Sequence, residues 1–155
     1  MELKTKVIAI DNTQNILITR QFDLPVALLF KAYTTPEIVA QWMGTKVLLL
    51  ENKNFGAYHF ETTDPMGNIH TFTGAIHEYI FNSKITRTFH MENTAFPVQL
   101  EFLSFEELDP RTSQLQMQIV FKSLTDRDNL LKMPFAQGIN WAHNRLQEIL
   151  TNSTE

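Results

Sequence analysis

The amino-acid sequence predicts an α+β fold in which a curved antiparallel β-sheet wraps around a long C-terminal helix, with two short helices after the second strand. Three observations support this prediction. Apolar and polar residues alternate with a period of two through most of residues 46–122. Towards the C-terminus the apolar spacing changes to three and four, which is typical of an amphipathic helix. Strands grouped apart from helices in this way indicate an α+β rather than an α/β fold.

The N-terminal residues predict a β-hairpin. A first strand, 5–10, is followed by the turn-forming residues 11–13 and by a second strand, 15–22. Ile16 and Ile18 share one face of the second strand, so one side of the hairpin can pack against a core.

Two short helices are expected next. Asp23 is a suitable N-cap for the first helix, and Pro25 lies near its first turn, where a missing N–H is tolerated. The first helix should end at Thr35, because the residue before a proline is driven out of the α region. Pro36 then starts the second helix, and Gly44 ends it.

The middle of the chain predicts six strands joined by short turns. The residues at 64–68, 81–83 and 109–111 are typical of tight connections between antiparallel strands. The strands are expected at about 46–53, 56–63, 68–81, 84–92, 97–107 and 113–122.

The chain should close with a helix at about 126–151, whose apolar stripe can lie across the sheet. Pro134 predicts a kink or a break near Met133. A sheet of this size curls, so the helix would cover its concave face. If the side chains do not fill that concavity, a cavity remains between the helix and the sheet.

Composition narrows the choice of protein class. The chain has 155 residues, which fits a single domain spanning 1–155, and it has no cysteine, which excludes disulfides and thiol nucleophiles. Its net charge is −4 and no stripe of Lys and Arg is visible, so nucleic-acid binding is not expected. No apolar run reaches the ~20 residues of a membrane span. We therefore expect a cytoplasmic protein without a cofactor.

The histidines do not indicate a metal site. None of them forms a pair at a recognised ligand spacing, so a structural or surface role is the simpler interpretation. His59 and His77 are expected to point outward from their strands. The five positions are His59, His70, His77, His90 and His143.

Two charged residues stand out because they lie on apolar strand faces. Glu78 shares the face of Phe72 and Ile76, and Arg87 alternates with apolar residues on the following strand. A buried charge requires a partner. We expect Glu78 and Arg87 to pair across the turn that joins their strands, with an anionic ligand for Arg87 as the alternative.

The residue pattern resembles the activator-of-heat-shock-ATPase homologue family, a branch of the START-like (SRPBCC, Bet v-like) superfamily. The resemblance covers nearly the whole chain, with motifs in the family's order and spacing. Phe55 is a departure, since the family often has glycine there, and Ile139 is another, since many relatives have tryptophan. The matching segments are Phe22-Asp23-Leu24-Pro25, 29–36, Gln41-Trp42, 54–60, 64–68, 72–78, 85–89 and 121–128, followed by Gly138 and Arg145-Leu146.

The resemblance implies the helix-grip fold and a cavity under the long helix. In that fold the two short helices close one mouth of the cavity, where Trp42 would plug or gate the opening. Each aromatic residue could instead be ordinary core packing. The residues expected to line a ligand site are Trp42, Tyr58, Phe60, Phe72, Glu78, Arg87, Phe89, Phe135 and Trp141.

Three functions follow as expectations. The first is binding of an apolar or amphipathic small molecule in the cavity. The second is a co-chaperone-like protein-interaction module that binds a heat-shock chaperone. Self-association through an exposed strand or the N-terminal hairpin is a separate expectation. The third is a cyclase- or hydrolase-like enzyme acting on a cavity-bound substrate, for which Glu78 with Arg87 is the candidate polar cluster. No catalytic residue is assigned, because the sequence contains no known nucleophile motif.

Overall fold

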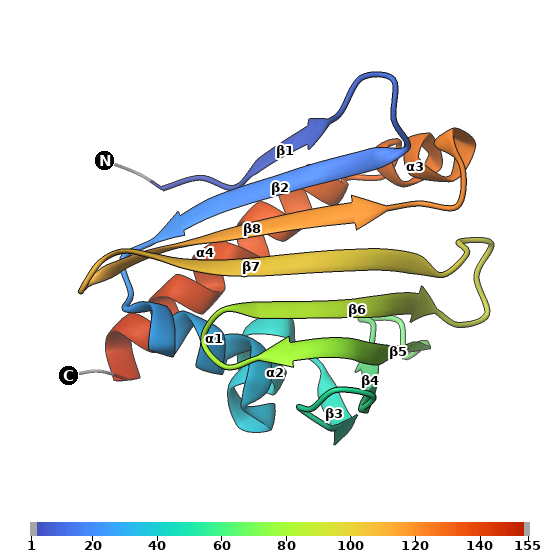
Figure 1. Ribbon diagram of the computed structural model, residues 1–155. Helices are drawn as coiled ribbons and strands as arrows, with labels where there is room; N and C mark the ends of the chain where they lie inside the picture. Colours follow the sequence, from blue (N-terminus) through green and yellow to red (C-terminus); the bar gives the residue numbers. More distant parts are fainter. Residues whose placement is uncertain (1–2, 154–155) are drawn as a thin grey trace.

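The computed structural model describes residues 3–153, which form an antiparallel sheet of eight strands and four helices. The strand order is β1-β2-β8-β7-β6-β5-β4-β3. Figure 1 shows the helix α4 crossing behind the sheet and the helices α1 and α2 below it. The strands are β1 Lys6–Ala9, β2 Asn15–Phe22, β3 Lys46–Leu50, β4 Ala57–Thr63, β5 Ile69–Ile80, β6 Lys84–Met91, β7 Gln99–Asp109 and β8 Thr112–Val120; the helices are α1 Val26–Thr34, α2 Pro36–Met43, α3 Leu124–Leu131 and α4 Phe135–Ser153. The predicted fold class is confirmed.

The connection between α1 and α2 follows from the sequence. Thr35 is extended and occupies the N-cap position of α2, and Pro36 begins that helix. Gly44 ends α2 in the left-handed conformation, with φ 62°, where a residue without a Cβ is favoured. The prediction for α1 was wrong in one respect. Its N-cap position is occupied by Pro25, and the backbone N–H of Asp23 instead donates to Gln147 on α4.

The C-terminal helical region is broken as the proline predicted. The helix α3 ends at Leu131 and α4 begins at Phe135, because Pro134 has no N–H with which to continue a helix. Ser123 caps α3 by accepting a hydrogen bond from the backbone N–H of Asp126 at 3.1 Å. The break lets α4 run along the concave face of the sheet, where Leu146 and Leu150 are buried.

A β-bulge interrupts β5 at His77. The register with β6 shifts between Ile76 and Glu78, so the residues on either side of the bulge do not follow one continuous alternation. Ile76 faces the core before the bulge. After it, Tyr79 packs against Phe30 with ring centroids 5.5 Å apart, and Glu78 turns towards solvent.

Gly74 on β5 allows the Tyr58 ring and the backbone of β6 to lie close to its Cα. The ring of Tyr58 on β4 lies over Gly74 on β5, and the Tyr58 hydroxyl donates to the backbone carbonyl of Thr88 on β6. A Cβ on Gly74 would overlap both the Tyr58 ring and that carbonyl oxygen. Glycine is therefore required here by contact rather than by backbone conformation.

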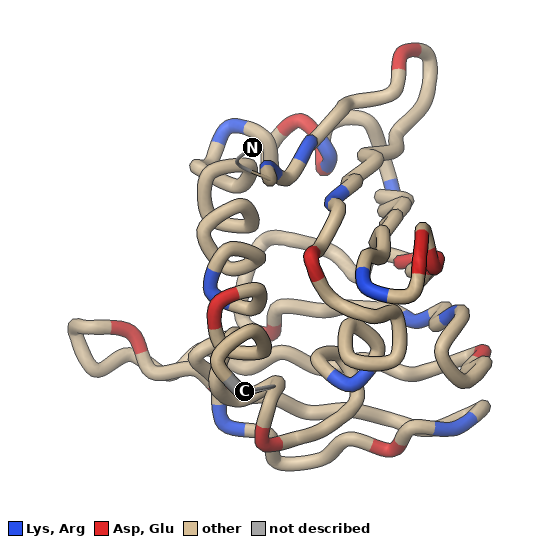
Figure 2. Tube along the Cα trace, turned by 90° about the vertical axis from the view of Figure 1, so that its left-hand side faces the viewer, with Lys and Arg blue, Asp and Glu red and all other residues tan. Residues whose placement is uncertain are grey.

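Charged residues are spread over many elements. Figure 2 shows Lys and Arg segments interspersed with Asp and Glu segments along the trace. None of the helices in the described part of the chain has the length and hydrophobicity that crossing a membrane requires. Within residues 3–153, no group of three or more His, Asp or Glu side chains could hold a metal ion.

Candidate functional site

A cavity of about 230 Å³ lies between the concave face of the sheet and α4. Strands β6, β7 and β8 form its floor, α4 forms its roof, and α1 and α2 close one end. Most of its lining is apolar, and five side chains on it can form strong polar interactions: Tyr33, Arg87, Gln99, Glu101 and His143. The lining residues are Tyr33, Trp42, Met43, Arg87, Phe89, Gln99, Glu101, Met117, Ile119, Phe135, Ile139, Ala142 and His143.

A buried ion pair forms part of the cavity floor. Arg87 on β6 and Glu101 on β7 are direct partners in the strand register, so their side chains emerge on the same face. Arg87 Nε donates to Glu101 Oε1 at 2.9 Å, and Gln99 Nε2 donates to Glu101 Oε2, also at 2.9 Å. The Arg87 guanidinium lies over the Tyr58 ring, 5.2 Å from its centroid. The pair is almost completely buried, with Glu101 only 3% exposed.

A hydrogen-bonded histidine lies at the opposite wall. His143 on α4 is 0% exposed, with Nδ1 2.8 Å from Thr5 Oγ1 and Nε2 3.1 Å from the Tyr33 hydroxyl. Burial, together with the positive charge of Arg20, lowers the pKa of His143 from 6.5 to about 3. Burial also raises the pKa of Tyr33 above its ordinary value. Both side chains are therefore neutral at neutral pH.

A second, smaller hollow adjoins the cavity. It measures about 220 Å³ and shares Met43 and Phe89 with the first. Phe89 stacks on Phe72 with ring centroids 5.5 Å apart, and Phe89 and Met43 form the wall that the two hollows share. Met43 is unbranched and flexible, so its side chain can change how far the two hollows communicate. The remaining walls are Thr45, Phe60, Thr62 and Phe72.

The structure places six of the nine predicted residues at these two hollows. Trp42, Arg87, Phe89 and Phe135 line the cavity, and Phe60, Phe72 and Phe89 line the adjoining hollow. Tyr58 lies in the core beneath Arg87.

Trp42 is a fixed part of the cavity wall. Its Nε1 donates to the Ala32 carbonyl at 2.6 Å, and its ring packs on Tyr33 at 5.1 Å. This arrangement favours a plug over a moving gate.

The other two predicted residues, Glu78 and Trp141, lie outside the hollows and face solvent. Glu78 is turned out by the bulge and pairs with Lys84 at 3.3 Å, so the expected pair with Arg87 was wrong. Trp141 is 62% exposed on the outer side of α4, where the Arg145 guanidinium lies 5.6 Å from its ring centroid.

Glu101 and His143 are the important residues that the sequence analysis missed. A signal for Glu101 exists, because it alternates in phase with Leu103 and Phe105, both of which are buried. His143 is four residues after Ile139 and three before Leu146, on the apolar stripe of α4. In the sequence analysis, His143 appears only as one of five histidines without ligand spacing, and Glu101 is assigned no role.

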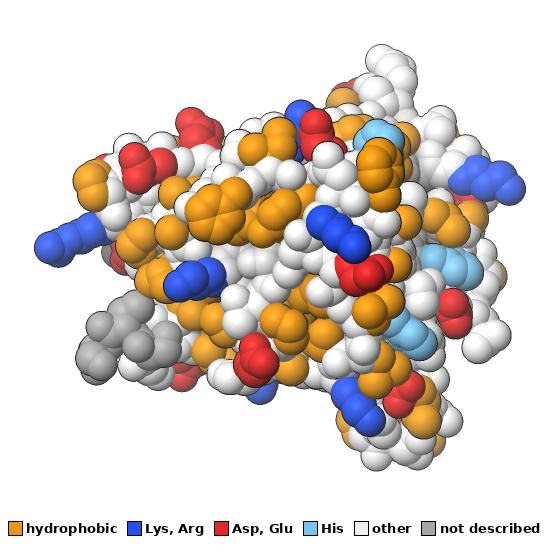
Figure 3. All heavy atoms as spheres, turned by 60° about the horizontal axis from the view of Figure 1, so that its bottom comes forward, with side chains coloured by type: hydrophobic (Ala, Val, Ile, Leu, Met, Phe, Trp, Pro, Cys, Tyr) orange, Lys and Arg blue, Asp and Glu red, His pale blue; other side chains and the backbone are white. Residues whose placement is uncertain are grey.

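Several large apolar side chains are exposed away from the cavity. Phe55, in the connection between β3 and β4, is 82% exposed, and Phe81, in the turn after β5, is 73% exposed. Phe55 also has a φ of 67°, in the left-handed region that glycine adopts without strain. On the lower face of the molecule, hydrophobic side chains reach the surface between isolated charged ones (Figure 3).

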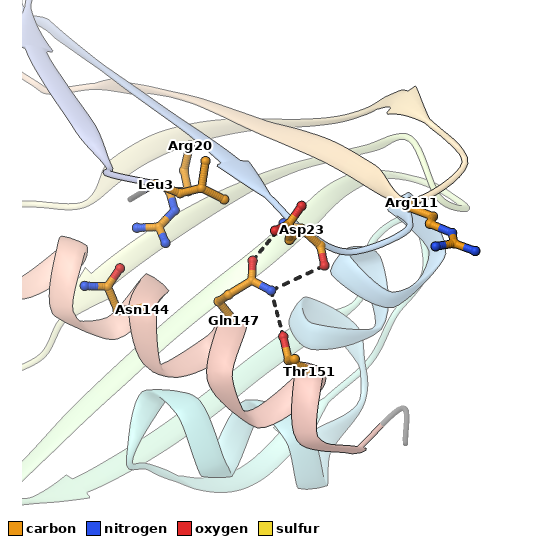
Figure 4. A pocket seen from close by; sticks show the side chains of 7 residues that line it. All are labelled: Leu3, Arg20, Asp23, Arg111, Asn144, Gln147 and Thr151. Carbon is orange, nitrogen blue, oxygen red and sulfur yellow. Dashed lines mark hydrogen bonds between the residues drawn. The ribbon is translucent and has the colours of Figure 1, made fainter. Parts of the chain in front are cut away.

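A larger polar hollow, of about 600 Å³, lies where α4 passes the start of α1 (Figure 4). Several of its polar side chains already have hydrogen-bond partners. Gln147 accepts from the Asp23 N–H at 2.8 Å and donates to Thr151 Oγ1, also at 2.8 Å. Arg20 donates to Thr5 and Asn140. We therefore regard the smaller, mainly apolar cavity under α4 as the better ligand site, because concave apolar walls with few polar groups are typical of such sites.

Comparisons with known proteins agree with this architecture. The family model described as "Activator of Hsp90 ATPase homolog 1-like protein" matches residues 23–151. No curated protein matches the sequence.

Solved bacterial structures share the fold. A Mycobacterium smegmatis protein is 20% identical with a TM-score of 0.85, covering 96% of this chain and 97% of that chain. A Rhodobacter sphaeroides protein is 17% identical with a TM-score of 0.86, covering 96% and 99%. A Staphylococcus epidermidis protein is 20% identical with a TM-score of 0.79, covering 100% and 96%.

Proposed function

This chain belongs to the family of activator of Hsp90 ATPase homolog 1-like proteins, and from that premise we propose that its cavity under α4 binds an apolar or amphipathic small molecule. The observation that carries the proposal is the cavity itself, about 230 Å³ in volume, with mainly apolar walls and a few convergent polar groups.

Its polar groups favour binding over catalysis. His143 has a pKa lowered to about 3 by burial, so it is a weak base at neutral pH. The raised pKa of Tyr33 keeps its hydroxyl protonated. Glu101 already accepts hydrogen bonds from Arg87 and Gln99. None of these side chains is activated as a nucleophile or a general base, and Glu78, which was expected to pair with Arg87, lies outside the cavity.

The test begins with the purified protein. Native mass spectrometry, repeated after organic extraction, should reveal a stoichiometric apolar adduct, and the extract should identify its chemical class. Thermal shifts with a panel of lipids and small aromatic compounds provide a second measurement.

A pair of variants on α4 makes the test specific. Ala142→Leu adds volume to the cavity roof, whereas Ala136→Leu makes the same change at an exposed position. We expect Ala142→Leu to abolish the adduct and the thermal shifts, and Ala136→Leu to preserve both. If the wild type carries no adduct and shows no shift with any compound, the proposal fails.

Binding of a protein partner is the second candidate. The exposed side chains of Phe55 and Phe81 favour it, since large exposed aromatic residues are frequent in interfaces. Pull-downs with a purified heat-shock chaperone, using Phe55→Ser with Phe81→Ser as the control variant, test it separately. Loss of capture in that variant, with ligand binding intact, would support this second function.

A further inference from the structure

The ion pair in the cavity leaves hydrogen-bond donors unused. Arg87 Nε is bound to Glu101 Oε1, and one face of the guanidinium is covered by the Tyr58 ring. Within residues 3–153, its terminal nitrogens Nη1 and Nη2 donate to no protein group, and no buried side-chain nitrogen or oxygen lacks a partner. The two nitrogens must therefore be accessible, and Arg87 lines the cavity.

The electrostatics of the cavity do not favour a negative ligand. The charge of Arg87 is already balanced by Glu101, and both Glu101 oxygens accept hydrogen bonds. His143 and Tyr33, the other titratable groups on the lining, are neutral at neutral pH. A ligand carboxylate bound at Nη1 and Nη2 would lose its hydration in a mainly apolar space and would lie near the carboxylate of Glu101.

A neutral oxygen acceptor avoids both penalties. A carbonyl oxygen gains charge-assisted hydrogen bonds from the guanidinium and loses much less hydration than an anion. A purely hydrocarbon ligand would displace water from these two donors without replacing the hydrogen bonds that the water makes.

We propose that the ligand of this cavity is an apolar molecule with one neutral carbonyl group, as in a ketone, ester or amide, and that Arg87 Nη1 and Nη2 donate hydrogen bonds to its oxygen. This inference rests on the proposed ligand-binding function and names the chemical class of the ligand.

The cavity volume limits the size of the apolar body. A cavity of about 150 Å³ accepts benzene, so about 230 Å³ accommodates an aromatic ring with a short substituent. A longer ligand would have to pass Met43 and Phe89 into the adjoining hollow of about 220 Å³.

Three probes of one shape isolate the head group. Acetophenone, isopropylbenzene and benzoate share the same skeleton of non-hydrogen atoms and differ in carrying a neutral carbonyl, no polar group or a carboxylate. Their affinities for the protein can be measured by NMR titration at neutral pH. We expect acetophenone to bind at least about tenfold more tightly than either of the other two. A hydrogen bond to a charged donor strengthens binding by about tenfold or more.

Two variants test the role of Arg87. Arg87→Met alone would leave Glu101 buried without its partner, so the neutral double variant Arg87→Met/Glu101→Gln is used, in which the residue at 101 can still accept from Gln99. We expect it to bind acetophenone and isopropylbenzene about equally. Arg87→Lys keeps the charge opposite Glu101 but removes the planar fork, and should reduce the preference for acetophenone.

The carbonyl stretching band of bound acetophenone gives a readout that folding defects do not mimic. It should lie at lower frequency in the wild type than in the double variant, since hydrogen bonding weakens the carbonyl bond. Circular dichroism verifies that both variants fold.

The outcomes distinguish this inference from the proposed ligand-binding function on which it rests. Equal affinity of the wild type for acetophenone and isopropylbenzene would overturn the inference and leave ligand binding intact. Tightest binding of benzoate, lost in the double variant, would show that Arg87 receives anions and would also overturn it. Failure of all three probes, with no adduct in native mass spectrometry, would overturn both proposals.

Discussion

Acidification should destabilise this protein through a single buried residue, His143. Its imidazole is completely buried between Thr5 and Tyr33. Burial and the charge of Arg20 hold its pKa at about 3 in the folded state, against 6.5 for an ordinary histidine. As the pH falls, the unfolded chain therefore takes up a proton before the folded protein does. Folding stability decreases below about pH 6.5 and continues to decrease until about pH 3.

The magnitude follows from the two pKa values. Between them, each pH unit removes about 1.4 kcal/mol of unfolding free energy. From about pH 7 to about pH 4.5 the loss attributable to His143 is roughly 2.5 kcal/mol. Small domains are stable by about 5–15 kcal/mol in total, so this loss is a large share.

The assay is urea denaturation followed by tryptophan fluorescence. Trp42 should report unfolding around His143, because the two ring centroids lie 6.2 Å apart. His143→Gln can still exchange hydrogen bonds with Thr5 and Tyr33 but does not titrate. We expect this variant to be less stable than the wild type at neutral pH, and the difference between them to shrink by roughly 2.5 kcal/mol by about pH 4.5.

His77→Gln is the matched control, because His77 is exposed and contacts Phe55. It should keep the acid dependence of the wild type. A constant difference between wild type and His143→Gln across this pH range would refute the reasoning, since it would mean that His143 takes up protons equally in the folded and unfolded states.

Other substitutions test individual contacts, each by urea denaturation. Glu101→Gln removes the counter-charge of Arg87 and should lower the unfolding free energy by about 3 kcal/mol. Adding Arg87→Met should recover part of that loss, because no unpaired charge then remains buried. A Glu101→Gln variant as stable as the wild type would contradict this. Gly74→Ala should destabilise by about 2 kcal/mol or more because its Cβ overlaps the neighbouring strands, whereas Gly138→Ala, with nothing within 4 Å, should stabilise by about 0.5–1 kcal/mol. Equal effects of the two glycine changes would argue against the overlap. Phe55→Gly should stabilise by about 0.5–1 kcal/mol by relieving its left-handed backbone, and a loss of stability would show that its side chain makes a needed contact.

The order of the elements could be predicted because each one leaves a local signal. Thr35 with Pro36 marks the boundary between the two short helices, and Pro134 marks the break before α4. These signals depend on backbone chemistry within a few residues, so tertiary packing does not alter them.

The candidate site was harder to predict because its geometry depends on strand register. The sequence places Glu78 and Arg87 on either side of one turn, which suggested a pair. The register instead sets Arg87 opposite Glu101, fourteen positions further along the chain. The bulge at His77 then reverses the facing of Glu78, and periodicity alone gives no warning of such an insertion.

The bulge in β5 also has a consequence for how this strand tolerates change. Before His77, the inward positions are even-numbered, as with Phe72 and Ile76; after it, the inward position is the odd-numbered Tyr79. In a scan of polar substitutions along β5, the positions that lose stability should therefore be even-numbered before His77 and odd-numbered after it. A relative that loses the extra residue would need to exchange its apolar and polar residues over the whole segment that follows, so deletions here should be rarer than substitutions.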